Sequence, residues 1–167
     1  MPPYFDGPDY IAALRVGIET ALAGLEFAPQ ALIASFHGMP ERTRALGDPY
    51  HDHCQRTASL LGAALGRDLI VAFQSRFGRA KWLEPYTEAA LDNYPSQGVK
   101  RLAVAAPGFS SDCLETLEEL GIRGRETFRA AGGEHFALLE CLNDSGEGVD
   151  LLDTLVRRDL AGWLAHA

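Results

Sequence analysis

Residues 101–120 read RLAVAAPGFSSDCLETLEEL, and this stretch decides the fold that the sequence predicts. Its first part, residues 102–106, is a short uninterrupted apolar run, which is typical of a strand buried on both faces of a sheet. Pro107 and Gly108 end the run, and an acidic helix start follows at once. We therefore expect a strand, a loop and a helix, with the loop at the carboxyl end of the strand, where open α/β sheets place their ligands.

The expected helix carries three carboxylates at spacings of three and four residues. On a helix, Asp112, Glu115 and Glu119 would lie along one stripe. A purely structural explanation is also available, because Asp112 as N-cap and Glu115 three positions later imitate a capping box, and acids in a first turn favour the helix dipole. These residues alone leave both explanations open.

Composition limits the classes of protein to consider. The chain has 167 residues, 47% hydrophobic and 23% charged, which fits one globular domain over residues 1–167. A net charge of −8 argues against a nucleic-acid partner. No apolar run approaches the roughly 20 residues of a membrane span, and the first residues lack the pattern of a signal peptide, so we expect a cytoplasmic protein. The three cysteines form neither a disulfide framework nor a metal knuckle.

The rest of the chain alternates apolar strands with amphipathic helices. Strands are expected at 31–36, 69–74, 102–106 and 135–141. Helices are expected at 9–25, 50–65, 87–94, 112–120, 124–131 and 149–163. This alternation predicts a three-layer αβα sandwich around a four-stranded parallel sheet. No GxGxxG, P-loop or GxSxG motif is present.

His37 follows the first expected strand, as the acidic segment follows the third. A lone loop histidine more often has a structural role than a chemical one. Here, however, the carboxyl ends of parallel strands meet at one edge of the sheet, so His37 and the carboxylates are expected to face one cleft.

A second cluster of metal-ligating residue types lies at the start of the helix expected at 50–65. His51, His53 and Cys54 form an HxHC pattern that resembles part of a zinc site. On a helix only His51 and Cys54 share a face, so a metal site is disfavoured there, and the role of this cluster stays open.

Several motif segments, in the same order, resemble the C-terminal half of the ferrochelatase family, over nearly the whole sequence. They are SFHGMP at 35–40, GDPY at 47–50, FQSR at 73–76, WLEP at 82–85, PGFSSDCLET at 107–116 and CLN at 141–143. The resemblance implies a chelatase-like fold and insertion of Fe²⁺ into protoporphyrin IX to form protohaem, with loss of two pyrrole protons. By motif position, His37 and Glu115 are implied as catalytic residues and as ligands of the substrate Fe²⁺, with Asp112 and Glu119 in support.

The chemistry of these residue types agrees with such a reaction. Neutral imidazole can bind a divalent metal and accept a proton, and carboxylates attract a hydrated cation and receive protons. A flat apolar macrocycle requires aromatic walls. The resemblance implies Trp82, Phe109 and Ser35 as porphyrin-binding residues. Arg123 stands where the acidic row of many family members continues, and no cysteine follows Cys141, so an iron–sulfur cluster is not expected.

The resemblance does not include the N-terminal lobe of the family. Because that lobe supplies the other wall of the cleft, we expect little or no turnover by this chain alone, and the choice between protoporphyrin and coproporphyrin stays open. Two alternatives remain: a one-domain chelatase that completes its cleft as a homodimer, and a non-catalytic tetrapyrrole-binding module. The presence of both His37 and Glu115 favours catalysis over mere binding. Peripheral membrane association is left open.

Overall fold

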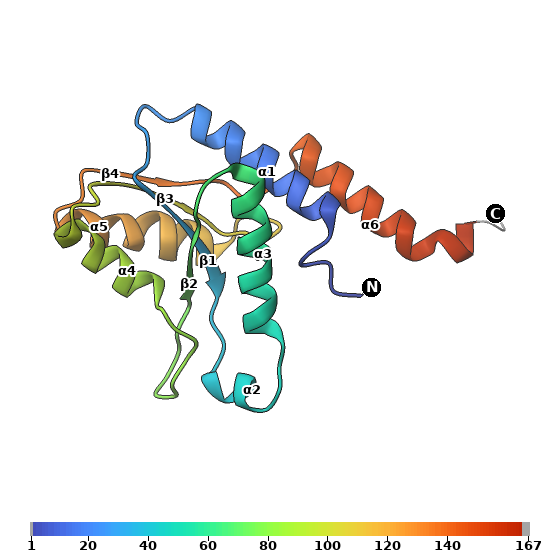
Figure 1. Ribbon diagram of the computed structural model, residues 1–167, viewed down its shortest axis with the longest axis horizontal. Helices are drawn as coiled ribbons and strands as arrows, with labels where there is room; N and C mark the ends of the chain where they lie inside the picture. Colours follow the sequence, from blue (N-terminus) through green and yellow to red (C-terminus); the bar gives the residue numbers. More distant parts are fainter. Residues whose placement is uncertain (1, 165–167) are drawn as a thin grey trace.

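A computed structural model describes residues 2–164 as one alternating series of strands and helices (Figure 1). The elements are α1 (Pro8–Ala23), β1 (Ala31–His37), α2 (Glu41–Ala45), α3 (Tyr50–Leu65), β2 (Ile70–Gln74), α4 (Thr87–Asn93), η1 (Tyr94–Gln97), β3 (Arg101–Ala105), η2 (Glu115–Gly124), α5 (Arg125–Ala130), β4 (His135–Leu138) and α6 (Gly146–Leu164). The expected alternation is therefore confirmed.

The four strands form one parallel sheet in the order β2-β1-β3-β4. β1 lies in the centre of the sheet, and its last residue, His37, is the register partner of Gln74 at the end of β2. The carboxyl ends of β1, β2 and β3 consequently meet at one edge, from which the loops after β1 and β2 extend (Figure 1). This edge carries the candidate site.

Helices cover both faces of the sheet, so the predicted three-layer sandwich is confirmed. Because side chains alternate along a strand, neighbours in one strand enter different cores. Leu32 and Ala103 pack with α1, α3 and α6. Ile33 and Val104 pack with α4, η2 and α5 on the opposite face. Two hydrophobic layers therefore hold the strands in place.

The fourth strand is shorter than the expected range 135–141, because β4 ends at Leu138. Beyond it the backbone N–H of Cys141 donates to the Asp112 carboxylate instead of continuing the sheet. The polar segment 39–47, expected outside the core, contains the short helix α2, none of whose residues is buried.

The helix after β3 differs most from expectation. It is a π-helix, η2, and it begins at Glu115, so Asp112 lies outside it, and neither the three-carboxylate stripe nor the capping box forms. A π-helix bonds i to i+5 and has a wider turn than an α-helix. Glycines let this wide helix approach the core: a Cβ at Gly124 would lie 3.0 Å from Leu91, and one at Gly121 would lie 3.2 Å from Leu138.

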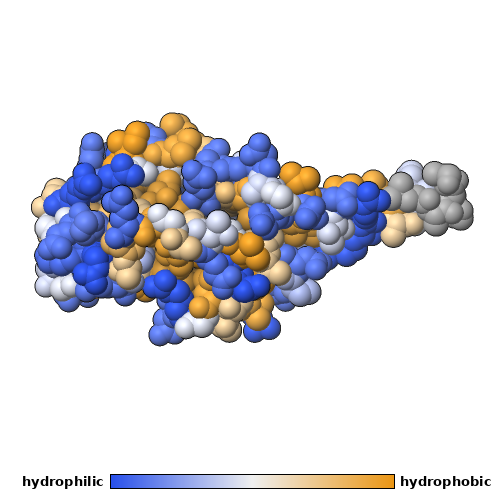
Figure 2. Space-filling model, turned by 90° about the horizontal axis from the view of Figure 1, so that it is seen from above, coloured by the Kyte–Doolittle hydropathy of each residue, from blue (hydrophilic) through white to orange (hydrophobic). Residues whose placement is uncertain are grey.

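The last helix, α6, packs on the body only near its start. Leu151 and Leu155 are buried against the core that contains α1. From residue 156 to residue 163 every side chain is exposed, and this part forms a narrow arm on the space-filling surface (Figure 2). Among the helices of residues 2–164, α6 included, none combines the length and apolarity that crossing a membrane requires.

Candidate active site

A cleft of about 320 Å³ opens at the carboxyl edge of the sheet. One side is formed by residues 73–77, at the end of β2 and in the loop after it. The other side is formed by Leu114 and by a face of η2 that carries Glu115, Glu119 and Arg123. The cleft thus has an acidic helical wall, as the predicted carboxylate cluster requires.

His37 is exposed at the end of β1; it does not line this cleft itself, but its register partner Gln74 does. Its Nδ1 lies 2.7 Å from the carbonyl oxygen of Gly38. Because a carbonyl oxygen only accepts, Nδ1 carries the proton, which leaves the lone pair of the neutral ring on Nε2. The Tyr50 hydroxyl donates to the His37 carbonyl oxygen at 2.8 Å, so the GDPY motif holds the backbone of this histidine.

Glu115 begins η2 and interacts electrostatically with His37. A hydrogen bond from Cys113 and one from its own backbone N–H lower the pKa of Glu115, burial opposes them, and a weaker electrostatic interaction with His37 adds to the lowering. Gln74 fixes the backbone here, because its Nε2 donates to the Glu115 carbonyl oxygen at 2.8 Å. Gln74, the register partner of His37, therefore connects the strand end that carries His37 to the backbone of Glu115.

Asp112 faces away from the cleft, toward the loop after β4. Its carboxylate accepts hydrogen bonds from Thr116 Oγ1 at 2.9 Å, from Asn143 Nδ2 at 2.7 Å and from the Cys141 N–H at 3.2 Å. Burial raises the pKa of Asp112, but these hydrogen bonds outweigh burial and lower it. Its supporting role is to fix the position at which η2 begins.

Glu119 lines the cleft and also connects η2 to β2. Its two carboxylate oxygens accept from the Ser75 backbone N–H and from the Ser75 hydroxyl, both at 2.6 Å. Ser75 has φ of 62°, which is uncommon for a residue with a side chain. Both oxygens of Glu119 are thus occupied in holding this turn, which joins η2 to β2.

Ser35, which the resemblance implied as porphyrin-binding, is 0% exposed. Its hydroxyl donates to Gln74 Oε1 at 2.7 Å and lies 2.8 Å from Thr87 Oγ1. A side chain without exposed surface offers no contact to a ligand. Ser35 instead orients Gln74, which in turn holds Glu115.

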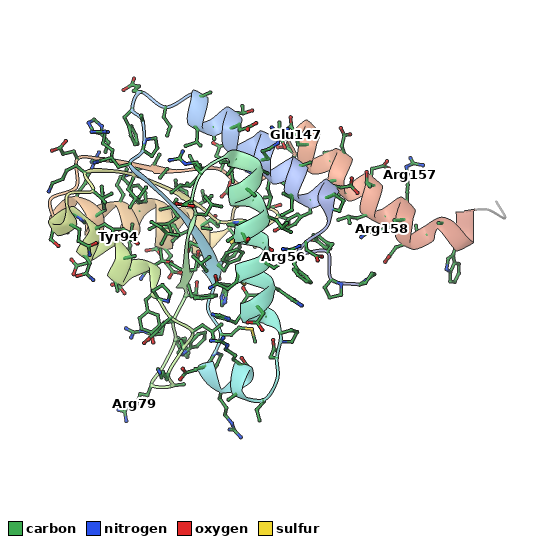
Figure 3. All side chains as sticks on the ribbon, in the orientation of Figure 1. Arg56, Arg79, Tyr94, Glu147, Arg157 and Arg158 are labelled. Atoms are coloured by element: carbon green, nitrogen blue, oxygen red, sulfur yellow. The ribbon has the colours of Figure 1, made fainter. Side chains whose placement is uncertain are left out.

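Phe109 lies near His37, and Trp82 lies next to the following residue, Gly38. The Phe109 ring centroid is 6.3 Å from that of His37. Trp82 lies next to Gly38, where a Cβ would come 3.2 Å from Trp82 Cε3 and 2.6 Å from the Gln74 carbonyl oxygen. The Trp82 indole N–H donates to the Phe77 carbonyl oxygen at 2.8 Å within the loop whose tip carries Arg79 (Figure 3). One aromatic ring is therefore close to the imidazole, and a second is close to the residue that follows it in the chain.

The HxHC pattern does not assemble into a metal site. His53 stacks on Phe5 with ring centroids 3.6 Å apart, His51 stacks on Phe73 at 5.8 Å, and Cys54 is buried. Within residues 2–164, no three His, Cys, Asp or Glu side chains are placed to hold a metal ion together. The three side chains serve packing instead.

Three residues that position the site were not assigned this role from sequence. They are Tyr50, Gln74 and Ser75. All three lie in motif segments, GDPY and FQSR, so a signal was present. Their roles depend on contacts between elements that only the folded chain brings together.

A parallel αβα sandwich with histidine and carboxylate at its carboxyl edge defines a chelatase-like class of site. The model of the family described as Ferrochelatase matches residues 1–160. The chain belongs to the ferrochelatase family.

Curated relatives agree with this family assignment. The chain is 51% identical over 166 residues to a ferrochelatase of Nitrobacter hamburgensis, covering 98% of this chain and 48% of the relative. It is 50% identical to a ferrochelatase of Agrobacterium fabrum and 52% identical to one of Rhizobium meliloti, again with 98% of this chain covered. The chain spans about half the length of these relatives, at 48% and 49% respectively.

Proposed function

We propose that this chain forms one wall of a ferrochelatase active site, in which Fe²⁺ replaces two pyrrole protons of protoporphyrin IX to give protohaem. The observation that carries the proposal is the link between His37 and Glu115 through Gln74, which pairs with His37 in the sheet register and donates to the Glu115 carbonyl oxygen at 2.8 Å. A base and a carboxylate at one edge suit a reaction that exchanges two protons for one divalent cation. The names of the relatives support the same activity.

In this proposal His37 accepts a pyrrole proton. With the proton of the neutral ring on Nδ1, bound to the Gly38 carbonyl oxygen, Nε2 is the free basic atom. Proton acceptance by Nε2 leaves an electron pair on a pyrrole nitrogen for Fe²⁺, and the imidazolium formed is stabilised by the nearby Glu115 carboxylate. The second proton leaves through Glu115 or water.

Glu115, like an ordinary glutamate, is a carboxylate at neutral pH, and the Cys113 hydrogen bond lowers its pKa further. Its negative charge attracts the substrate Fe²⁺, for which oxygen and imidazole ligands are suitable. Phe109 beside His37 and Trp82 beside Gly38 provide flat apolar surface for the macrocycle. Ser35, Asp112 and Glu119 act by positioning.

Four further features belong to the proposal. Fe²⁺ is a substrate, and we propose that no iron–sulfur cluster is required. We propose protoporphyrin as the porphyrin and the cytoplasm as the location. The chain alone is expected to show little turnover, because the relatives contain as much chain again, from which the second wall of the cleft would come.

The decisive test is His37→Ala in a full-length hybrid. Residues 2–164 of this chain would replace the matched half of the Nitrobacter hamburgensis ferrochelatase, and metal insertion would be followed by visible absorbance. We expect His37→Ala to reduce kcat at least about a hundredfold, the lower range for loss of a general base. His135→Ala at the other end of the sheet is the matched control, expected to keep full activity. Normal turnover by the His37→Ala hybrid would refute the mechanism.

Two other functions are outcomes of related measurements. Efficient turnover by this chain alone, together with a stable dimer in sedimentation, would support the one-domain homodimeric chelatase. Tight porphyrin binding without turnover in an intact hybrid would support the non-catalytic binding module.

A further inference from the structure

The last helix, α6, exposes a continuous apolar stripe. Its members are separated by three or four residues, which places them on one face of a helix. They are Val149 (53% exposed), Leu152 (51%), Val156 (46%), Leu160 (41%) and Trp163 (80%). A row of five large apolar side chains in water is unusual for a surface without a partner.

The stripe is distinct from the face that α6 already uses. Leu151 and Leu155, one residue before Leu152 and Val156, are 7% and 2% exposed and pack on the body. Residues 156–163 of α6 include no buried side chain, and this part of the helix projects as an arm (Figures 1 and 2). Helical stability in proteins comes mostly from packing an apolar face, so this arm requires a covering surface.

The charge of α6 argues against a lipid surface as the partner that covers the apolar stripe. The helix carries four acidic residues against two arginines, Arg157 and Arg158, which project from its exposed part (Figure 3). Anionic lipid headgroups attract basic helices, and this helix has a negative balance. An apolar protein surface fits better.

The comparisons indicate which protein surface is available. The family match extends to residue 160, so most of the stripe belongs to a family element. The relatives contain about as much chain again as this chain matches. We propose that the stripe docks the half of a full-length ferrochelatase that this chain does not match, as a helix in an apolar groove.

A small cavity places this interface next to the candidate site. Leu152 lines a cavity of about 110 Å³ together with Tyr4 and with Phe109 of the loop after β3. The unmatched half of a full-length ferrochelatase, docked on the stripe, would therefore reach the loop that carries Phe109. The proposal rests on family membership and relative length, and it does not depend on the chemistry assigned to His37.

Hydrogen exchange tests the proposal directly. The α6 peptides of this chain alone are compared with the same peptides in the hybrid, in which residues 2–164 replace the matched half of the Nitrobacter hamburgensis relative. Residues 156–163 are expected to exchange at least about tenfold more slowly in the hybrid, because local opening then costs the docked interface. In a Trp82→Phe background, Trp163 emission is expected to shift to the blue in the hybrid.

Matched variants separate the stripe from the rest of the helix. Leu160→Asp in the hybrid is expected to abolish the added protection, because it introduces a charge into the apolar contact. Arg158→Gln, two residues from both Val156 and Leu160 and hence on another side of the helix, is expected to keep it. Both positions are exposed in this chain, so neither substitution disturbs its core.

If a different partner covers the apolar stripe, the same measurements give different results. Equal exchange of the α6 peptides in the chain and in the hybrid would overturn the proposal. If the hybrid does not fold, the exchange of the aligned α6 peptides in the unaltered full-length relative, measured alongside, decides instead. Concentration-dependent protection of this chain, with a dimer in sedimentation, would assign the stripe to a second copy. A blue shift of Trp163 with vesicles of equimolar phosphatidylcholine and phosphatidylglycerol would assign it to a membrane. Either of these results, without protection in the hybrid, would overturn the proposal.

Discussion

Asp112 and Asn143 bind each other in both directions. The Asn143 side-chain amide donates to the Asp112 carboxylate at 2.7 Å, and the Asp112 backbone N–H donates to the Asn143 side-chain oxygen at 2.8 Å. This reciprocal pair joins the loop after β3 to the loop after β4. It therefore fixes where η2 begins, and with it the position of Glu115.

Asp112→Ala is expected to destabilise the fold. It leaves Thr116, Cys141 and Asn143 without their shared acceptor, and an unsatisfied group in such a network costs about 1–3 kcal/mol. We expect the free energy of unfolding in urea to fall by about 2 kcal/mol. Asp144→Ala, at an exposed position in the same loop, is the control and should change it little. Equal stabilities of the two variants would contradict the structural role.

The Asp112 network also predicts a pH dependence. Its hydrogen bonds lower the pKa of Asp112 in the folded protein, even though burial acts in the opposite direction. The unfolded state then binds the proton more tightly than the folded state. The contribution of the Asp112 carboxylate to the free energy of unfolding is therefore complete above about pH 5 and is lost as the pH falls through the folded pKa. The stability difference between wild type and Asp112→Asn is expected to shrink from pH 5 to pH 3 in urea titrations. A constant difference would show that the carboxylate charge does not matter.

Ser75 and Glu119 are expected to be energetically coupled. The Glu119 carboxylate accepts two hydrogen bonds from Ser75, at 2.6 Å each, and thereby holds a turn with positive φ. Only the hydroxyl bond is removed by Ser75→Ala, while Glu119→Ala removes both. A double-mutant cycle on unfolding free energy is expected to give a coupling of about 1 kcal/mol. Strict additivity of the two substitutions would argue that the hydroxyl bond contributes nothing.

Gly38→Ala is expected to damage both the sheet edge and the aromatic wall. A Cβ there would lie 2.6 Å from the Gln74 carbonyl oxygen, which is backbone and has little room to move. We expect a loss of stability of about 2–3 kcal/mol, as for other overpacking substitutions, and a change in Trp82 fluorescence. Gly162→Ala is the control, because no atom lies within 4 Å of its added Cβ. Unaltered Trp82 emission in Gly38→Ala would show that the site tolerates the methyl group.

Strand prediction worked because each strand consists mostly of apolar residues in a short run. The run at 102–106 became β3, and buried parallel strands need this composition on both faces. The last strand was predicted too long, because Cys141 is apolar but its N–H bonds to Asp112. Composition does not reveal where a backbone donor finds its partner.

The prediction of the site also succeeded for some residues and failed for others. Placing His37 and Glu115 at one edge needed only strand order and the motif resemblance, and in the structure Gln74 at the end of β2 pairs with His37 and bonds to the backbone of Glu115. Asp112 was expected on the helical stripe, yet it precedes η2 and binds Asn143, 31 positions later in the chain. Helical spacing assumes that the helix has already begun, and a side-chain contact decided its starting point.

The sequence by itself determined the parallel αβα architecture, the family and the residue types at the carboxyl edge. These follow from local apolar periodicity and from motifs that are continuous in the chain. Only the tertiary structure decided the π-helical form of η2, the burial of Ser35 and the positioning contacts made by Tyr50, Gln74 and Ser75. These depend on hydrogen bonds between residues far apart in the chain, whose partners become defined only when the sheet and its two helical layers pack together.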